Sequence, residues 1–201
     1  MWQGFGGASS RYLVWSQQWF ANDGFHVQLF RWSSEHGITA IGEFQEQLFG
    51  VTISSDGNVL VASRDLDNSG GFRWSPSQGL TPIDFSPFAL NGDGSVIVGA
   101  RADGVVRWTE ETGSRVIQPG VSRSLLSGLV ATASLDVVAG SDRDGNGFRW
   151  TESTGSKQLG AFEESGIVLQ NIDSTGDVLA GVEANVARDA RAFRWTETGG
   201  F

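Results

Sequence analysis

Side chains that could do covalent or acid–base chemistry are scarce in this chain of 201 residues. It has no cysteine, which excludes a thiol nucleophile, a thiolate metal site and a disulfide. A Ser-His-Asp triad would have to use His26 or His36, and no Gly-x-Ser-x-Gly nucleophile elbow is present. Glycoside hydrolysis needs an acid of raised pKa near a second carboxylate. The acidic candidates lie mainly in predicted connecting segments, where charged side chains keep a protein soluble and need no catalytic role. They are Glu43, Glu46, Glu110, Glu111, Glu163 and Glu164. We therefore expect no enzymatic activity.

An aromatic segment near the start is the best candidate for ligand binding. Trp15 and Trp19 are an even number of residues apart, so on a strand they would share one side with Gln17. Two aromatic faces flanking an amide suit a saccharide. The candidate ligand-binding residues are Trp15, Gln17, Trp19 and Phe20, with Asp23 and His26 nearby. The alternative is that these aromatics only pack the first repeat against its own neighbours.

Two acidic loops are candidates for calcium. Asp65 and Asp67 precede Asn68 and Gly70, and Asp142 and Asp144 precede Asn146 and Gly147. Alternating carboxylate and amide oxygens with a turn glycine resemble the first half of a calcium loop, but the closing Glu of an EF-hand is absent from both. The alternative is a solvated hairpin loop whose Asp and Asn side chains cap the backbone. Calcium is the one cofactor that the sequence suggests.

The charge balance limits the classes of partner that the chain is expected to bind. Lys and Arg number 14 against 23 Asp and Glu, so the formal net charge is −9. This balance argues against a nucleic-acid backbone as partner. No stretch approaches the ~20 apolar residues of a membrane helix, so we expect no membrane insertion, and the first residues lack the pattern of a signal peptide. A carbohydrate or a protein ligand is compatible with this charge. The sequence does not predict the oligomeric state.

The strongest signal is an internal repeat. An aromatic residue or Val, then Arg, Trp, and Ser or Thr, recurs five times. The tryptophans of these copies are Trp32, Trp74, Trp108, Trp150 and Trp195. A fixed repeat of about 40 residues indicates one supersecondary unit per copy, stacked on its neighbours.

Each copy contains four predicted strands. A turn rich in Ser, Asp, Asn and Gly leads into a β-branched run, as in Ser55-Asp56-Gly57-Asn58 before Val59, and the Phe-Arg-Trp strand follows. A glycine-containing linker and two further alternating segments complete the repeat. We predict an all-β fold, a β-propeller of about five four-stranded antiparallel blades or a fragment of a larger ring, in one domain over 1–201. The expected repeats are approximately 1–42, 43–84, 85–120, 121–160 and 161–201.

Alternation also predicts how the blades pack. Phe and Trp of each motif are two residues apart, so both should point to one neighbouring blade and all five repeat tryptophans should be buried. The Arg between them points the other way and needs a carboxylate or carbonyl partner, because an unpaired guanidinium is costly to bury. This expectation covers Arg31, Arg73, Arg149 and Arg194. Candidate acidic partners are Asp23, Asp65, Asp142 and Asp189.

The repeated motif resembles a known family. Phe148-Arg149-Trp150-Thr151, the following Thr154-Gly155 and Leu159-Gly160, and the Asp-Gly turn before a Val-rich strand are similar to the bacterial HAF-type extracellular repeats. Val106 and Leu135-Asp136 depart from the pattern. The resemblance implies a propeller-like architecture and an extracellular or cell-surface location, and it carries no catalytic residue. We expect a non-catalytic module for recognition or surface display, with a glycan-binding lectin-like propeller as the first alternative and a propeller glycosidase or polysaccharide lyase as the second.

Overall fold

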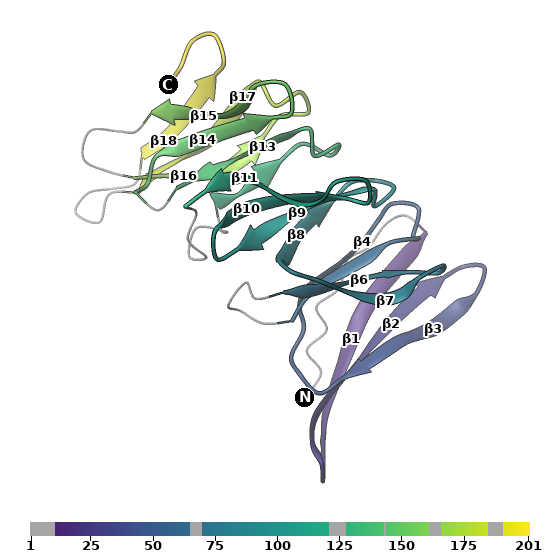
Figure 1. Cartoon of the computed structure of the whole chain (residues 1–201). Helices are drawn as coiled ribbons and strands as arrows, with labels where there is room; N and C mark the ends of the chain where they lie inside the picture. Colours follow the sequence, from purple (N-terminus) through teal and green to yellow (C-terminus); the bar gives the residue numbers. More distant parts are fainter. Residues whose placement is uncertain (1–10, 65–69, 121–127, 143, 161–165, 185–190) are drawn as a thin grey trace. The chain divides into compact units, whose positions relative to one another are not determined.

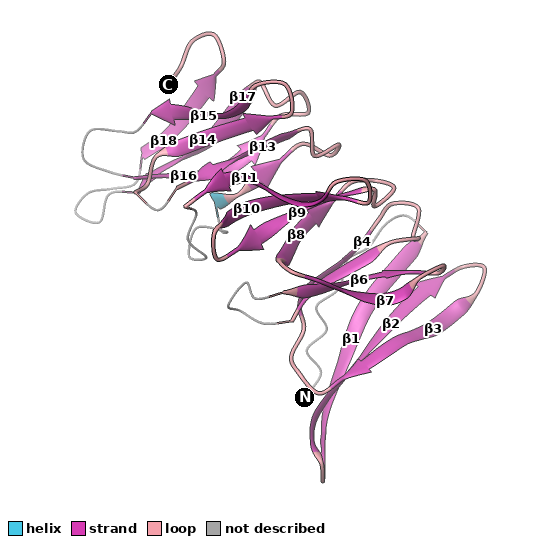
Figure 2. Cartoon of the chain, viewed as in Figure 1, coloured by secondary structure: helices cyan, strands magenta, loops and turns pink. Residues whose placement is uncertain are grey.

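The computed structural model describes residues 11–64, 70–120, 128–142, 144–160, 166–184 and 191–201 (Figure 1). Their regular structure consists of strands, with one short helical piece at Gly128 (Figure 2). No helix among the described residues is long and apolar enough to cross a bilayer. The described part of the chain is thus all-β, as predicted, and its strands form five small sheets.

The strands follow the order of the chain from sheet to sheet. The first sheet holds β1 (Tyr12–Ala21), β2 (Gly24–Ser33) and β3 (Gly37–Phe44). The second holds β4 (Phe49–Ile53), β5 (Leu60–Ser63), β6 (Gly71–Ser75) and β7 (Gly79–Ile83). The third holds β8 (Ser86–Leu90), β9 (Val96–Arg101), β10 (Gly104–Thr109) and β11 (Gly113–Pro119). The fourth holds β12 (Val130–Ala131), β13 (Val137–Ser141), β14 (Gly147–Thr151) and β15 (Gly155–Gly160). The fifth holds β16 (Gly166–Ile172), β17 (Val178–Ala184) and β18 (Arg191–Thr196).

The number of strands differs between sheets. Among the described residues, the second, third and fourth sheets have four strands, whereas the first and fifth have three. The strand pairs are antiparallel, and consecutive strands are neighbours in every sheet. The chain divides into two compact units, residues 1–101 with 107–114 and residues 102–106 with 115–201. The division passes through β10 and β11 of the third sheet.

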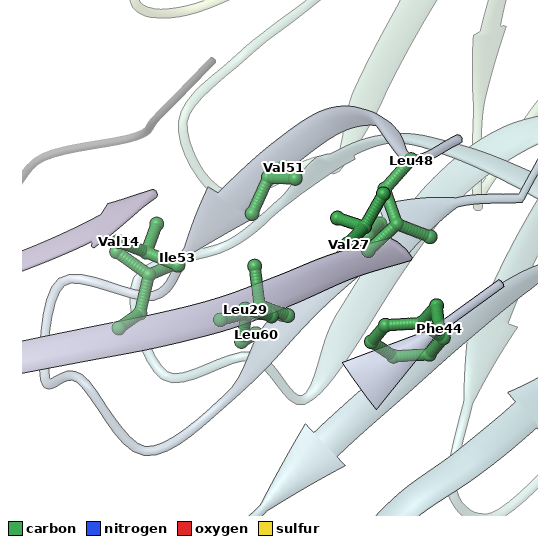
Figure 3. Packing of buried hydrophobic residues seen from close by; sticks show 9 residues of the cluster. Val14, Val27, Leu29, Phe44, Leu48, Val51, Ile53 and Leu60 are labelled. Carbon is green, nitrogen blue, oxygen red and sulfur yellow. The ribbon is translucent and has the colours of Figure 1, made fainter. Parts of the chain in front are cut away.

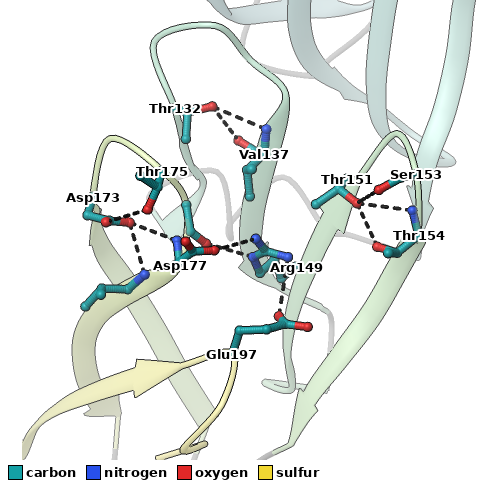
Figure 4. Close-up of polar contacts among 12 residues, drawn as sticks. Thr132, Val137, Arg149, Thr151, Ser153, Thr154, Asp173, Thr175, Asp177 and Glu197 are labelled. Carbon is teal, nitrogen blue, oxygen red and sulfur yellow. Dashed lines mark hydrogen bonds and ion pairs between the residues drawn. The ribbon is translucent and has the colours of Figure 1, made fainter.

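The same turn follows every repeat tryptophan. The Ser or Thr after the Trp accepts, through its Oγ, a hydrogen bond of 3.0–3.3 Å from the backbone N–H three residues on. Thr151 and Thr154 show this contact (Figure 4). A glycine then takes a left-handed φ of 64–67°, which a side chain would strain. These glycines are Gly37, Gly79, Gly113, Gly155 and Gly200.

A second turn precedes the second strand in four of the sheets. Its first residue accepts, through a side-chain oxygen, the backbone N–H of the valine five residues on, as Thr132 does from Val137 and Asp173 from Val178 (Figure 4). Ser54 and Asn91 do the same in the other two turns. The fourth residue of the turn has a positive φ, which glycine supplies in three copies.

Leu135 takes the glycine position in the remaining copy. Its φ is 59°, and it is the one non-glycine residue among those described with a positive φ. This is where the sequence departs from the Asp-Gly pattern. A left-handed conformation costs a leucine about 1–2 kcal/mol, and the side chain of Leu135 is buried.

The core of the first unit lies between the first and second sheets. One face of the first sheet contributes Val14, Val27 and Leu29, and the second sheet contributes Ile53 and Leu60 (Figure 3). Phe72 and Trp74 pack against the same cluster. The Phe and Trp of the second sheet therefore point towards the preceding sheet, as alternation predicts.

The second unit repeats this arrangement. Leu169, Leu179 and Trp195 of the fifth sheet form a buried cluster with Ala139 of the fourth sheet. Ala139 pairs with Arg149 across β13 and β14, so the Arg-bearing face of the fourth sheet meets the Trp-bearing face of the fifth.

The burial prediction for the repeat tryptophans was too strong. Trp150 and Trp195 are buried, whereas Trp32, Trp74 and Trp108 keep part of their surface exposed. An indole is large and lies near the turn end of each sheet, so part of its ring reaches the solvent.

Candidate functional site

The hairpin of β1 and β2 is longer than the matching strands of the other sheets. Each of its strands has 10 residues, whereas β5 has 4 and β6 has 5. The pairing of β2 with β3 ends at Val27 and Phe44, so the hairpin continues alone to its turn and projects past β3 (Figure 1). We call residues 19–26 the hairpin extension. No strand of the second, third, fourth or fifth sheet in the described chain reaches 10 residues.

Three of the four candidate ligand-binding residues lie on one face of this hairpin. Cross-strand pairing sets Trp15 opposite Phe30, Gln17 opposite Gln28, and Trp19 opposite His26. Side chains of directly opposed residues lie on the same face of a sheet. The result is a ladder with an amide pair in the middle and an aromatic pair on each side.

Both aromatic pairs are stacked. The rings of Trp15 and Phe30 are 5.4 Å apart with an interplanar angle of 19°, and those of Trp19 and His26 are 5.2 Å apart with an angle of 12°. Trp15, Gln17 and Trp19 are each half-buried. Stacking fixes the ring planes while leaving part of each indole in contact with solvent.

Phe20 does not join this ladder. It follows Trp19 on the strand and therefore points to the opposite face, opposite Phe25, whose ring lies 5.2 Å away. Phe20 is 82% exposed at the end of the hairpin. The structure thus separates it from Trp15, Gln17 and Trp19.

His26, Asp23 and Glu43 form a cluster that we call the charged clamp. It holds the outer aromatic pair, Trp19 and His26. His26 is buried and contacts Asp23 through Nε2 at 2.8 Å and Glu43 through Nδ1 at 2.7 Å. The hydrogen bond to Asp23, followed by that to Glu43, raises the pKa of His26 above its ordinary value of 6.5. The same contact with His26 lowers the pKa of Asp23. The imidazolium form donates through both nitrogens, so the clamp holds the ring plane on which Trp19 stacks.

One of the two central amides, that of Gln28, is held by backbone carbonyl groups. Gln28 donates through Nε2 to the carbonyl oxygen of Gly42 at 2.7 Å and to that of Leu29 at 3.3 Å. The side-chain carbonyl oxygens of Gln17 and Gln28 are groups that can accept hydrogen bonds at this point of the ladder. Neither Gln28 nor Glu43 was singled out with the aromatic segment from sequence, because their place depends on pairing between strands that are about 15 residues apart. The signal available was the even spacing of His26 and Gln28 on the strand after the turn.

The acidic loops form no metal site among the residues described. Asp65 and Asp67 lie outside the described residues. Asp142 accepts hydrogen bonds from the backbone N–H of Asp144 at 3.0 Å and of Asn146 at 2.8 Å, which caps its own hairpin loop. Within the described ranges, no group of three or more His, Asp or Glu side chains is placed to hold a metal ion.

Two of the repeat arginines, Arg31 and Arg149, bind the following sheet rather than their own acidic loop. Arg31 donates through Nε to the carbonyl oxygen of Gly57 at 3.0 Å, and Arg149 donates to that of Gly176 at 2.8 Å. Arg149 also lies 3.5 Å from Asp177 and 3.4 Å from Glu197 (Figure 4). The expectation of a carboxylate or carbonyl partner therefore holds for Arg31 and Arg149.

The same expectation was wrong for Arg73 and Arg194. Arg73 donates to the side-chain oxygen of Gln78 at 2.7 Å, and Arg194 is exposed. The acidic partners proposed from spacing were also wrong where they are described, since Asp23 binds His26 and Asp142 caps its loop. Asp65 and Asp189 lie outside the described residues.

Comparison with solved structures defines the class of fold. A structure from a study of two prolyl endopeptidases, on inter-domain dynamics in catalysis and specificity, matches with a TM-score of 0.68 and 10% identity over 98% of this chain and 34% of that chain. TolB from Acinetobacter baumannii matches with a TM-score of 0.54 and 12% identity over 97% of this chain and 52% of that chain. The chain therefore spans about a third and about half of these two proteins.

These neighbours are propeller-like, and at such identity they show the fold alone. The chain is an all-β protein of small antiparallel sheets with a propeller-like fold. No family model and no curated protein matches the sequence.

Proposed function

We propose that the protein is a non-catalytic recognition module that binds a carbohydrate on the ladder face of its first hairpin. The binding residues are Trp15, Gln17 and Trp19, together with Gln28. The observation that carries this proposal is the pair of stacked, half-exposed indoles that flank two amides on a hairpin longer than its counterparts.

The spacing of the ladder suits an extended chain of sugar rings. Trp15 and Trp19 are four residues apart on one strand, about 13 Å at the usual rise of a strand. Two indole faces at this spacing can stack separate pyranose rings of one oligosaccharide, and the amides between them can bond the hydroxyls. A linear oligosaccharide lying along the hairpin therefore fits better than a single sugar.

Charge favours a neutral glycan. The chain has a formal net charge of −9, and Asp23 and Glu43 lie beside the outer aromatic pair. An anionic polysaccharide would meet repulsion from the whole molecule, since the one cationic group of the clamp is enclosed by these two carboxylates. Binding of a neutral glycan should consequently depend little on ionic strength.

The chemistry of the clamp supports binding rather than hydrolysis. A glycosidase needs a carboxylic acid with a raised pKa, whereas the hydrogen bond from His26 lowers the pKa of Asp23. No serine or threonine contacts His26 through the hydrogen bonds that are described. The ladder supplies stacking surfaces and amides, which recognise a sugar without breaking its bonds.

The wider proposal concerns the architecture. We take the five sheets as successive blades of a propeller-type array, with the repeated turns and the directional Phe and Trp faces as support. The resemblance to HAF-type repeats supports an extracellular or cell-surface location. We propose that binding requires no cofactor, because Asp142 already accepts hydrogen bonds from its own loop, through Oδ1 from two backbone amides and through Oδ2 from the side chain of Asn146.

A glycan array on the purified chain, with and without calcium, tests the function. We expect binding to neutral linear glycans that calcium does not alter, and loss of binding in Trp19→Ala with the midpoint of urea unfolding nearly unchanged. Phe20→Ala is the matched control, because it removes an exposed aromatic next in the chain from the opposite face. Wild-type protein that binds no glycan, with Trp19→Ala unfolding much earlier, would show that the aromatics serve packing. Turnover of a glycan would show an enzyme instead.

A further inference from the structure

His26 connects the charged clamp to the ladder face. It pairs with Trp19 across the hairpin, and the two rings are 5.2 Å apart with an angle of 12° between their planes. The side chain of His26 is 8% exposed, whereas those of Asp23 and Glu43, which contact its two nitrogens, are 66% and 52% exposed. The clamp is thus an enclosed imidazole between two hydrated carboxylates, and the outer indole of the site stacks on that imidazole.

The geometry of the clamp fits only a protonated ring. Nδ1 of His26 lies 2.7 Å from Oε1 of Glu43, and Nε2 lies 2.8 Å from Oδ1 of Asp23. A neutral imidazole has a proton on one nitrogen and a lone pair on the other. In either neutral tautomer, one carboxylate oxygen would face a bare nitrogen with no proton between the two acceptors. Both contacts are satisfied together only when both nitrogens carry a proton.

The other charged side chains of the first sheet and its flanks are placed away from the imidazole. β1 carries no charged residue. Arg31 of β2 donates to the second sheet, and Glu46, which follows β3, forms an ion pair with Arg64 at 2.9 Å. The charged residues at the opposite end of β1 and β2 from the hairpin turn are Arg11, Glu35 and His36. Among the described residues, the two clamp carboxylates are the groups that raise the pKa of the imidazole, with the hydrogen bond to Asp23 as the largest cause.

We propose that His26 is a positioning residue of the carbohydrate site, and that its proton, held between Asp23 and Glu43, keeps the ring of Trp19 in place for the ligand. Binding on the ladder face is therefore regulated by pH. This inference rests on the proposed function, because it concerns the regulation of the same site.

Loss of the proton releases one side of the clamp. The carboxylate that faces the bare nitrogen turns to the solvent, in which it is already more than half exposed. The imidazole then loses one of the two hydrogen bonds that fix its plane, together with the positive charge that attracts the indole face. Binding must now order the ring of Trp19, which weakens affinity. We expect a loss of about fivefold in affinity, as for one net hydrogen bond, when pH rises through the raised pKa of His26.

Two measurements on the full chain test this proposal. An NMR titration of the glycan-free protein locates the pKa of His26, and the indole N–H signal of Trp19 should shift with the same midpoint. Isothermal titration calorimetry with cellohexaose, xylohexaose and chitohexaose is then carried out below and above that midpoint. The glycan that binds should bind about fivefold more weakly above it.

The decisive variant is Glu43→Gln. Its side-chain amide can donate to a bare Nδ1, while a neutral His26 donates through Nε2 to Asp23, so the clamp stays closed without the extra proton. This variant should therefore bind the glycan equally well on both sides of the wild-type midpoint. Asp23→Asn should do the same at the other nitrogen, and it keeps the test valid if one of the two variants fails to fold.

The matched control is His36→Gln, which removes the other histidine of the chain and should keep the full pH response. Equal wild-type affinity below and above the midpoint overturns the inference but leaves the proposed function standing. Glu43→Gln and Asp23→Asn variants that keep the wild-type pH response also overturn it. Binding of none of the three glycans at any pH overturns the proposed function, and this inference with it.

Discussion

The charge on His26 links the hairpin to pH. Its pKa in the folded chain lies above the ordinary value of 6.5, because Asp23 and then Glu43 bond the protonated ring. The stability that the protonated ring contributes is therefore fully present below pH 6.5 and is lost as pH rises through the raised pKa. We expect the unfolding free energies of wild type and His26→Gln to differ most in weakly acidic solution and to converge at higher pH. Urea unfolding across this range measures it, and curves that stay parallel would exclude the clamp.

The pKa of Asp23 sets the lowest pH at which the contact between Asp23 and His26 stabilises the folded chain. This pKa is lowered from 3.8 by the hydrogen bond to His26. The contribution of Asp23 to the unfolding free energy is present above pH 3.8 and is lost as pH falls through the lowered pKa.

The sequence predicted that Trp15, Gln17 and Trp19 share a face, since that follows from alternation along one strand. It did not predict the clamp, which needs Glu43 to be brought beside His26 by the third strand.

Burial predicts which repeat tryptophan matters most for stability. Trp150 is 3% exposed, so Trp150→Ala should lower the unfolding free energy by about 3–5 kcal/mol. Trp32→Ala should cost clearly less, because Trp32 keeps part of its surface exposed in the folded chain. Chemical denaturation of both variants makes the comparison, and an unchanged midpoint for Trp150→Ala would contradict the packing described.

At the scale of the elements, two kinds of turn glycine can be told apart. Gly155 has a φ of 66° and open space around the position of a Cβ, so Gly155→Ala should cost only backbone strain, about 1–2 kcal/mol. Gly176 has a φ of 79°, and a Cβ there would come within 2.6 Å of Val137. Gly176→Ala should therefore cost distinctly more. Thermal and urea unfolding of the two variants tests this, and equal losses would argue against the close approach.

These turns show which features of the fold the sequence predicts and which it does not. A glycine five residues after each repeat tryptophan predicts a tight turn, and the structure places a left-handed residue at each one. Leu135 could not be predicted, because a left-handed leucine is unfavourable by itself and is held by the turn around it. The backbone N–H of Leu135 donates to the carbonyl oxygen of Thr132 at 2.9 Å, as Gly57 does to Ser54 in an equivalent turn.

At the scale of the whole molecule, the repeat predicted the kind of fold better than the exposure of matching residues. The spacing of the tryptophans indicated five small antiparallel sheets, which the structure contains. It could not show that Leu13, paired with Trp32, is 46% exposed whereas Leu60, paired with Trp74, is buried, because every copy of a repeat gives the same expectation.

Carbohydrate recognition by the first hairpin is the central claim, and one measurement addresses it directly. Two-dimensional NMR spectra of the full chain would be recorded while cellohexaose, xylohexaose and chitohexaose are added in turn. We predict that one of them shifts the indole N–H signals of Trp15 and Trp19 and the side-chain amide signals of Gln17 and Gln28, with little change at Trp150 or Trp195. Shifts centred away from the hairpin, or no shift with any of these glycans, would contradict the account.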